Sequence, residues 1–261
     1  MKKIMLCGLA AIIFVISCKK DSLSPGSSFW GCHASTYYFT YPSGHTDTTI
    51  VTYISDDSLS YTLHATGGIY IYCFKIKGDS VILRTYENNL STLFYYGSSL
   101  LNSQKFAVTD DYFHGNGTPN NSGNSTYNSE GRAVHTYSDY GTYQSDYINY
   151  FDGNGNKTYT IANYTGLSPH RDSFAYDYNL TRTNKAYYGY PYSRLYGIPD
   201  KNLVLQIRRY DTNTDTLNSY SNYTYILDPD GYISQKTTVT SNSGSGGAYT
   251  YIEKFIISCS N

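Results

Sequence analysis

The sequence predicts an all-β, tyrosine-rich protein: an antiparallel meander that forms a curved sheet or an incomplete barrel. Tyr occupies 33 of the 261 positions, whereas charged residues make up only 15% of the chain. Tyr favours strands because its ring packs on a pleated surface while its hydroxyl stays hydrated. Short segments rich in Tyr, Thr, Ile and Val alternate with turn clusters, and no window keeps a helical period.

Residues 1–17 are typical of a lipoprotein signal peptide. Lys2 and Lys3 precede an apolar run from Ile4 to Ile16, which is shorter than the ~20 residues that span a bilayer as a helix. The run ends in Val15-Ile16-Ser17-Cys18, which resembles the lipobox of bacterial lipoproteins, whose cysteine is acylated and exposed by cleavage. Cys18 is therefore the predicted lipidation site, with an ordinary signal peptide as the alternative.

Residues 18–30 are predicted to be a lipidated tether, followed by a single β domain over 31–261. The tether contains Pro25 and Gly26 and has no periodicity. The inner-membrane retention signal of lipoproteins is an Asp directly after the lipidated cysteine, and Lys19 stands there instead. The sequence Cys18-Lys19-Lys20-Asp21 is similar to the start of many Bacteroidota-type lipoproteins. The predicted location is the outer membrane, on its periplasmic face or on the cell surface.

Three cysteines remain in the predicted mature domain, an odd number for an oxidising compartment. A disulfide between Cys32 and Cys259 would join the first and last strands. A bond between Cys32 and Cys73 is the alternative, and three unpaired thiols are the third option.

The region after Ser35 is predicted to be a series of hairpins. The clearest is Gly68–Tyr86, in which Gly78-Asp79 lies between two β-rich arms. The Gly/Asn/Ser-rich tract His114–Gly131 is predicted to be a long mobile loop, or a junction between two sheet sections near 114–131. Thr240–Ala248 is predicted to be the tip of a final hairpin.

Three segments share one pattern: a strand end, a polar turn that closes on Gly, and a departing strand. The glycines are Gly131, Gly155 and Gly231, and Gly suits such a turn because a positive φ costs it little. The segments resemble degenerate tyrosine–aspartate wraps of Rhs-type shells.

The order of segments over Tyr127–Phe255 resembles a narrower group. "NKAYYGYPYSRLYGIPDKNLVLQI" (Asn184–Ile207) is followed by "SYSNYTYILDPDGYISQKTTV", as in an uncharacterised family of Bacteroidota-type lipoproteins with a porin-like fold. Two features depart from that family: proline is missing from Asn184-Lys185-Ala186-Tyr187, and Ile233 follows Gly231-Tyr232. The resemblance implies a curved sheet or barrel and supplies no catalytic residues.

The stretch "YFDGNGNKTYTIANY" raises the question of a metal site. Asp152, Asn154 and Asn156 are spaced like the first ligands of a calcium loop, but such a loop needs Gly at its sixth position and an acid at its twelfth. Lys157 and Asn163 stand there instead. The stretch is therefore predicted to be a hairpin turn, and no metal or cofactor is predicted.

Catalytic signatures are weak. Ser168, His170 and Asp172 are near neighbours in sequence, whereas a catalytic triad converges from separate elements. No Gly-x-Ser-x-Gly elbow occurs, and the three glutamates form no recognisable acid pair. We predict that the protein is not an enzyme. Nucleic acid is not an expected partner, because the net charge is −1 and no basic patch is present.

Two surface features suggest modification or binding. Asp followed by Ser or Thr and an aliphatic residue resembles the O-glycosylation acceptor of Bacteroidota-type periplasms, and marks Ser58, Ser80 and Thr216. The cluster "YYGYPYSRLY" could stack on sugar rings through Tyr187, Tyr188, Tyr190, Tyr192 and Tyr196, with sheet packing as the alternative.

The predicted function is that of a non-catalytic outer-membrane lipoprotein, either structural or binding a glycan or an envelope protein. The alternative is a polysaccharide hydrolase of the envelope, which needs two carboxylates that converge in a cleft. A membrane-spanning barrel is disfavoured, because the strands lack a clean apolar band for lipid and the chain already has a predicted anchor.

Overall fold

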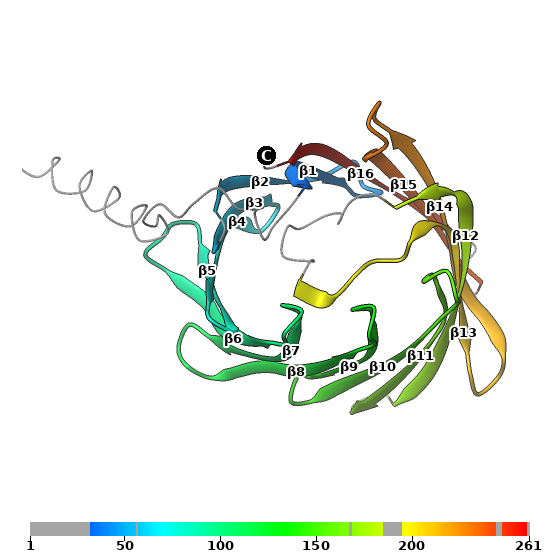
Figure 1. The fold of residues 1–261 in the computed structure, drawn as a ribbon, viewed down its shortest axis with the longest axis horizontal. Helices are drawn as coiled ribbons and strands as arrows, with labels where there is room; N and C mark the ends of the chain where they lie inside the picture. Colours follow the sequence, from blue (N-terminus) through cyan, green and yellow to red (C-terminus); the bar gives the residue numbers. More distant parts are fainter. Residues whose placement is uncertain (1–31, 56, 167–168, 185–194, 244–246, 260–261) are drawn as a thin grey trace, which may run out of the picture.

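The chain folds into a closed antiparallel barrel. The computed structural model describes residues 32–55, 57–166, 169–184, 195–243 and 247–259. These residues form sixteen strands in a meander, and β16 pairs with β1 to close the ring (Figure 1). The strands are β1 (Cys32–Thr40), β2 (Thr46–Ile54), β3 (Ser58–Ala65), β4 (Gly68–Lys77), β5 (Ser80–Glu87), β6 (Leu93–Leu101), β7 (Ala107–His114), β8 (Pro119–Tyr127), β9 (Ala133–Asp139), β10 (Tyr143–Phe151), β11 (Lys157–Gly166), β12 (His170–Thr183), β13 (Asn202–Asp211), β14 (Thr216–Leu227), β15 (Ile233–Asn242) and β16 (Ala248–Cys259).

The prediction of an all-β antiparallel meander is confirmed, but the prediction of a curved sheet or an incomplete barrel is wrong. The antiparallel pairing of β1 with β16 runs from Cys32 opposite Cys259 to Thr40 opposite Ile252. Closure satisfies the backbone N–H and C=O groups that both strands would otherwise present at open edges.

The loop or junction predicted over His114–Gly131 is also corrected. Pro119–Tyr127 forms strand β8, which pairs with β7 on one side and β9 on the other. Small residues suit this position: a Cβ on Gly123 would lie 2.9 Å from the carbonyl oxygen of Tyr137 on β9. Pairing on both sides therefore overrides the low intrinsic strand preference of Asn, Ser and Gly.

The predicted glycine turns are hairpin turns at one end of the barrel. Asn128 donates its N–H to the Arg132 carbonyl (3.0 Å), and its Oδ1 accepts the Arg132 N–H (2.9 Å). Gly131 stands at φ 82°, and the same pattern recurs around Gly155 and Gly231, at φ 81° and 83°. Each turn introduces a bulge that is typical of three-residue hairpin loops.

A fourth turn of this kind lacks the glycine. Asn102 accepts the Phe106 N–H through Oδ1 (3.0 Å), and Lys105 takes the left-handed position at φ 66°. Lys105 Nζ contacts Asp79 Oδ1 of the neighbouring turn at 2.8 Å. The turn was not predicted, because its sequence has Lys where the other three have Gly.

Alternation along the strands separates an inner wall from an outer wall. A cavity inside the barrel is lined by residues that include Thr136, Tyr147, Thr160 and Phe174. The register pairs Thr136 with Tyr147 and Thr160 with Phe174 on neighbouring strands. Their sequence neighbours therefore face outward, because successive side chains of a strand point to opposite faces.

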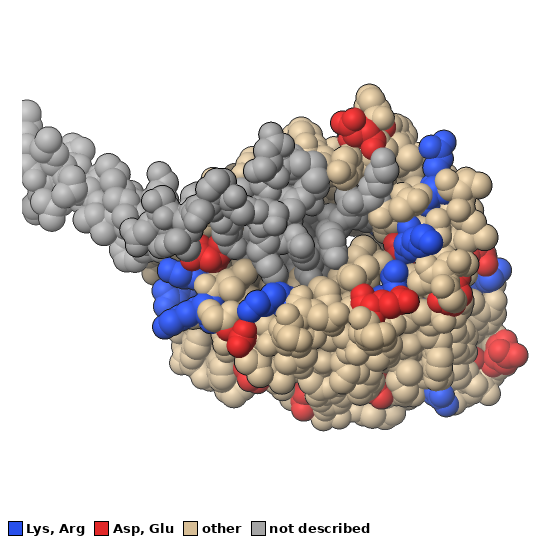
Figure 2. Space-filling model, in the orientation of Figure 1, with Lys and Arg blue, Asp and Glu red and all other residues tan. Residues whose placement is uncertain are grey.

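The outer wall is polar at the middle of many strands. Asp177 pairs with Arg208 (3.1 Å), and Gln206 donates to Asn222 (2.8 Å). Other polar side chains at comparable outward positions are Arg84, Asp111, Asn124, His135, Asp146, Asn163 and Lys254. Single apolar side chains such as Ile50, Ile82, Leu100 and Ile226 are exposed among them. Figure 2 shows charges of both signs scattered over the visible face.

We predict that Gly155→Ala lowers the free energy of unfolding by about 1–3 kcal/mol. The new Cβ would adopt a positive φ and lie 2.4 Å from Nη2 of Arg132. Thermal unfolding followed by circular dichroism measures the loss. Gly153→Ala in the same turn is the control, because its Cβ would meet nothing within 4 Å. Equal melting temperatures for both variants would contradict the prediction.

Candidate functional site

The connection between β12 and β13 turns into the lumen. Leu195–Lys201 is the part of this connection beyond Asn184 that the structure describes, and it lies inside the ring of strands (Figure 1). Leu195 is 1% exposed and packs against one side of the inner wall. The other members of this cluster are Leu59, Tyr61, Phe74, Val81, Leu101 and Ala107. We call Leu195–Lys201 the inward segment.

Two glycine turns hold the inward segment from one side. The Ile198 N–H donates to the Gly131 carbonyl at 2.8 Å, and Arg132 Nη1 donates to the Pro199 carbonyl at 2.6 Å. Asp200 Oδ1 accepts the Lys157 backbone N–H at 2.9 Å. These bonds attach the segment to the turns that precede β9 and β11.

Arg132 connects three parts of this rim. Its side chain is 9% exposed, Nε donates to Glu130 Oε2 (3.1 Å), and the guanidinium carbon lies 5.8 Å from the Phe151 ring centroid. Gly155 leaves the space that the guanidinium fills. Because the guanidinium of Arg132 fills the space beside Gly155 where a side chain would otherwise lie, the two turns and the inward segment pack together as one unit.

A buried amide pair fixes the point where the segment enters β13. Asn202 donates its N–H to Asn156 Oδ1 (2.9 Å), and Asn156 Nδ2 donates to Asn202 Oδ1 (3.0 Å). Asn156 is fully buried. Reciprocal bonding of this kind satisfies both amides without water.

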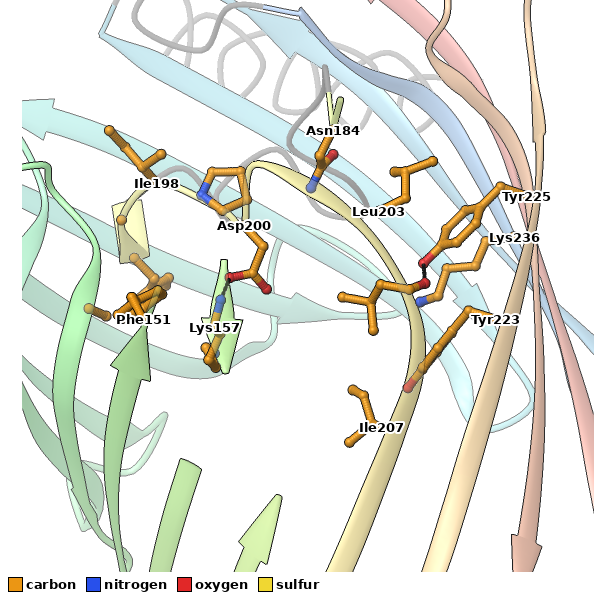
Figure 3. Close-up of a pocket in the computed structure, with 15 residues that line it drawn as sticks. Phe151, Lys157, Asn184, Ile198, Asp200, Leu203, Ile207, Tyr223, Tyr225 and Lys236 are labelled. Atoms are coloured by element: carbon orange, nitrogen blue, oxygen red, sulfur yellow. Dashed lines mark hydrogen bonds between the residues drawn. The ribbon is translucent and has the colours of Figure 1, made fainter. Parts of the chain in front are cut away.

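The remaining lumen holds two adjoining cavities of about 410 and 580 Å³, which share Lys157, Ile207 and Tyr223. Figure 3 shows the first, which lies below the inward segment and between the side chains of Phe151, Tyr225 and others. Both volumes fall within the ~300–1,000 Å³ typical of small-molecule sites.

Two ion pairs lie on the cavity wall. Arg209 Nε donates to Asp172 Oδ2 at 2.8 Å, and that carboxylate is 2% exposed. Lys236 Nζ lies 2.5 Å from Glu253 Oε2, and the Tyr37 hydroxyl donates to Oε1 of the same carboxylate at 2.9 Å. Each of these charges is therefore neutralised within the wall.

Lys157 differs from these two cations. Among the described residues, no carboxylate lies within 4.0 Å of its Nζ, which sits 5.6 Å from the ring centroid of Tyr176. Burial lowers the pKa of the Lys157 ammonium, and the more distant charge of Asp200 opposes that shift. The side chain contributes to both cavities.

Several tyrosine hydroxyls are held in the protonated form. Burial raises the pKa of Tyr176 to about 12, and Tyr176 shares a 3.1 Å hydrogen bond with Thr160. Burial also raises the pKa of Tyr178, and the charge of Asp200 adds to that effect. The Tyr176 phenol, which lines the second cavity, is therefore a neutral hydrogen-bonding group at ordinary pH.

The predicted hairpin turn at Asp152 is present. Asp152 Oδ1 accepts the N–H groups of Asn154 (2.9 Å) and Asn156 (2.8 Å), so the carboxylate organises the turn. No three His, Cys, Asp or Glu side chains within the described ranges gather closely enough to hold a metal ion.

The acid of the Ser168, His170 and Asp172 group, which the sequence does not favour as a triad, is engaged in the structure. Asp172 lies 3.7 Å from His170 Nε2 but is bonded more closely to Arg209. Ser168 lies outside the described residues.

The register bears on the predicted disulfide. The Cα atoms of Cys32 and Cys259 are partners in the β1–β16 ladder, and the bond itself stays a prediction. Cys73 lies on β4, three strand spacings or about 14 Å from β1, which is beyond the ~7 Å Cα separation that a disulfide spans.

The other predicted sites also stay predictions. Ser58 is 4% exposed and donates to Asp57, whereas Ser80 is half-buried beside a turn and Thr216 is exposed, so access favours the latter two for glycosylation. Tyr196 lies in the cavity wall, 3.1 Å from the Tyr112 hydroxyl. Tyr187, Tyr188, Tyr190 and Tyr192 lie outside the described residues, as does Cys18.

Sequence reasoning missed the residues that form the lumen. Arg132, Lys157 and Asn202 carry no motif of their own. The tyrosines of the cavity left a usable signal, because Phe174, Tyr176 and Tyr178 alternate along one strand, as do Tyr223 and Tyr225. Such spacing places them on one face, although it does not say which face.

Comparisons with solved structures define the class of fold as a porin-like β-barrel. A porin-like protein from Bacteroides uniformis matches with a TM-score of 0.57 and 13% identity, covering 86% of this chain and 96% of that one. A porin-like protein from Bacteroides vulgatus matches with a TM-score of 0.50 and 10% identity, covering 86% and 98%.

The porin-like part of the predicted resemblance is thus confirmed, while the lipoprotein family and the tyrosine–aspartate wraps stay predictions. No protein-family model and no curated protein sequence matches the chain. Within the described residues, no helix has the length and hydropathy to cross a bilayer.

We predict that the stability of the barrel falls as pH rises from about 10 to 12. Over that range unfolded Tyr176 releases its proton while folded Tyr176 keeps it, so unfolding releases a proton and becomes more favourable. Urea midpoints measured across this range should fall less steeply in Tyr176→Phe than in the wild type. Identical slopes would contradict the assignment.

Proposed function

We propose that this protein is a non-catalytic ligand-binding lipoprotein of the bacterial outer membrane. The barrel lies outside the bilayer, is attached to the membrane by a lipid on Cys18, and holds a ligand in its lumen. The main support for this proposal is the difference in polarity between the two walls. The outer wall is polar at the middle of the strands, and the inner wall encloses a cavity.

The outer wall favours water over lipid. A bacterial outer-membrane barrel presents an apolar band ~25 Å tall, and Arg or Lys at the bilayer midplane costs about 2–4 kcal/mol each. Arg208 lies near the middle of β13, and Asp146, near the middle of β10, forms a hydrogen bond with His135. Polar side chains at these outward positions support a location of the barrel outside the bilayer. A barrel outside the bilayer then needs a separate anchor to stay at the membrane.

The arrangement of the chain ends is compatible with a tether. In a meander of sixteen strands, β1 begins and β16 ends at the same rim, which also carries the glycine turns. The predicted tether of residues 18–30 ends two positions before Cys32, where β1 begins. The predicted partners are accordingly the membrane, through lipid, and a glycan or envelope protein; nucleic acid is not proposed.

The cavity supports binding rather than hydrolysis. Glycoside hydrolysis needs one proton-donating acid and one free carboxylate. Asp200, which lines the first cavity, accepts the Lys157 backbone N–H. Beside the cavities, Asp172 is bonded to Arg209, and Glu253 is bonded to Lys236 and Tyr37. These inner-wall carboxylates already serve the structure.

The anchor is tested by Cys18→Ser in the native host. The variant should move from the membrane fraction to the soluble fraction, because the lipid is the proposed attachment. Carbonate washing and immunoblotting of both fractions measure the shift, and Cys7→Ser within the signal peptide is the control. Retention of Cys18→Ser in the washed membrane would indicate a lipid-embedded barrel and overturn the proposal.

Binding in the lumen is tested by filling the cavity. Full-length protein purified from the envelope in detergent should carry a small molecule that native mass spectrometry detects. Ser221→Trp lines the cavity and should lose it, whereas Asn222→Trp on the outer wall should keep it. Loss in both variants, or in neither, would contradict a lumen site.

A further inference from the structure

The inner wall of the second cavity combines ring faces with hydrogen-bonding groups. Tyr147, Phe174, Tyr176 and Tyr223 supply the rings. Thr136, Asn149, Thr160, Ser219 and Ser221 supply hydroxyl and amide groups between them. Most of these groups already hold a hydrogen bond within the wall, as Thr160 does with Asn149 and Ser221 does with Thr240. A hydroxyl oxygen has further acceptor capacity, which a hydrocarbon chain cannot use. A ligand with flat apolar faces and many hydroxyls, such as a saccharide, satisfies both.

The charges of the wall add a second requirement. The Arg209–Asp172 and Lys236–Glu253 pairs are internally neutral, so neither calls for a charged ligand. Lys157 has no contacting carboxylate among the described residues, although it is half-buried between the two cavities. Asp200 is bonded to the Lys157 backbone N–H and leaves the ammonium donors uncommitted.

A half-buried ammonium without a contacting anion is unfavourable, because it loses part of its hydration without receiving a charged partner. The Tyr176 ring face, 5.6 Å away, and the more distant charge of Asp200 offset this cost only partly. A ligand carboxylate at this point would complete the pair and would place the rest of the ligand against the tyrosine wall.

We propose that the lumen binds an acidic saccharide, with its carboxylate at Lys157 and its sugar rings against Tyr147, Tyr176 and Tyr223. This inference rests on the proposed function, and it adds the chemical class of the ligand. A neutral sugar offers Lys157 no contacting anion, and a fatty acid offers the wall no hydroxyls.

Calorimetric titration of the detergent-solubilised full-length protein with trigalacturonate tests the charge. Its fully methyl-esterified form is the matched probe, because it keeps the rings and removes the carboxylates. Trigalacturonate should bind at least tenfold more tightly than the ester, and its affinity should fall as salt is raised. Equal affinity for the two probes would overturn the inference.

Variants assign the effect to one residue. Lys157→Met should weaken trigalacturonate binding at least tenfold, Lys157→Arg should stay within about threefold of the wild type, and exposed Lys254→Met on the outer wall should bind as the wild type does. Unchanged affinity in a folded Lys157→Met, verified by circular dichroism, would also overturn the inference.

The outcome separates this inference from the function on which it rests. If the envelope-derived molecule is lost in Ser221→Trp but trigalacturonate does not bind, the lumen binds a different chemical class and only the inference fails. If Ser221→Trp and Asn222→Trp carry the same molecule, the lumen site itself fails, and with it the inference.

Discussion

The pairing of β1 with β16 is the constraint on which the rest of the structure depends. All other ladders join strands that are neighbours in sequence, and each could form in an open sheet. The closing ladder joins the two ends of the described chain, from Cys32 opposite Cys259 to Thr40 opposite Ile252, and it alone creates an interior. Without it, the inward segment would have one wall to pack against, and no cavity would be enclosed.

A sixteen-stranded barrel is too wide for its own side chains to fill. The inward segment fills one side of the lumen, where Leu195 packs in the apolar cluster. The other side, formed mainly by β10–β15, keeps its polar and aromatic side chains uncovered and forms the cavities. Arg132 and the Asn156–Asn202 pair set that division, because they bind the segment to the rim from one side.

The sequence was informative about local structure and silent about closure. Gly78-Asp79 and the turns at Gly131, Gly155 and Gly231 were predictable because they need residues that tolerate positive φ. Closure was not predictable, because a strand in an open sheet and a strand in a barrel share one alternation, and the difference lies in pairing between residues more than two hundred positions apart. Strand β8 was missed for a related reason: its Asn, Ser and Gly side chains carry little strand preference, and its two neighbours hold it. Lys157 could be placed beside a turn from the sequence, but its lack of an ion-pair partner depends on three-dimensional neighbours.

The high tyrosine content of the chain suits both the inner and the outer wall of the barrel. Its ring packs against neighbouring strands on either face, and its hydroxyl bonds to a protein group inside, as Tyr176 does with Thr160, or to water outside, as exposed Tyr150 is placed to do. The shared fold with the porin-like proteins therefore constrains the backbone and leaves the polarity of each wall free to change. In this chain the outer wall carries Asp177–Arg208 and Gln206–Asn222 at the height where a lipid-embedded barrel needs apolar side chains. The same strands turn Tyr176, Ile207 and Tyr223 inward. The proposal of a binding protein therefore rests on the arrangement of the two walls more than on the fold.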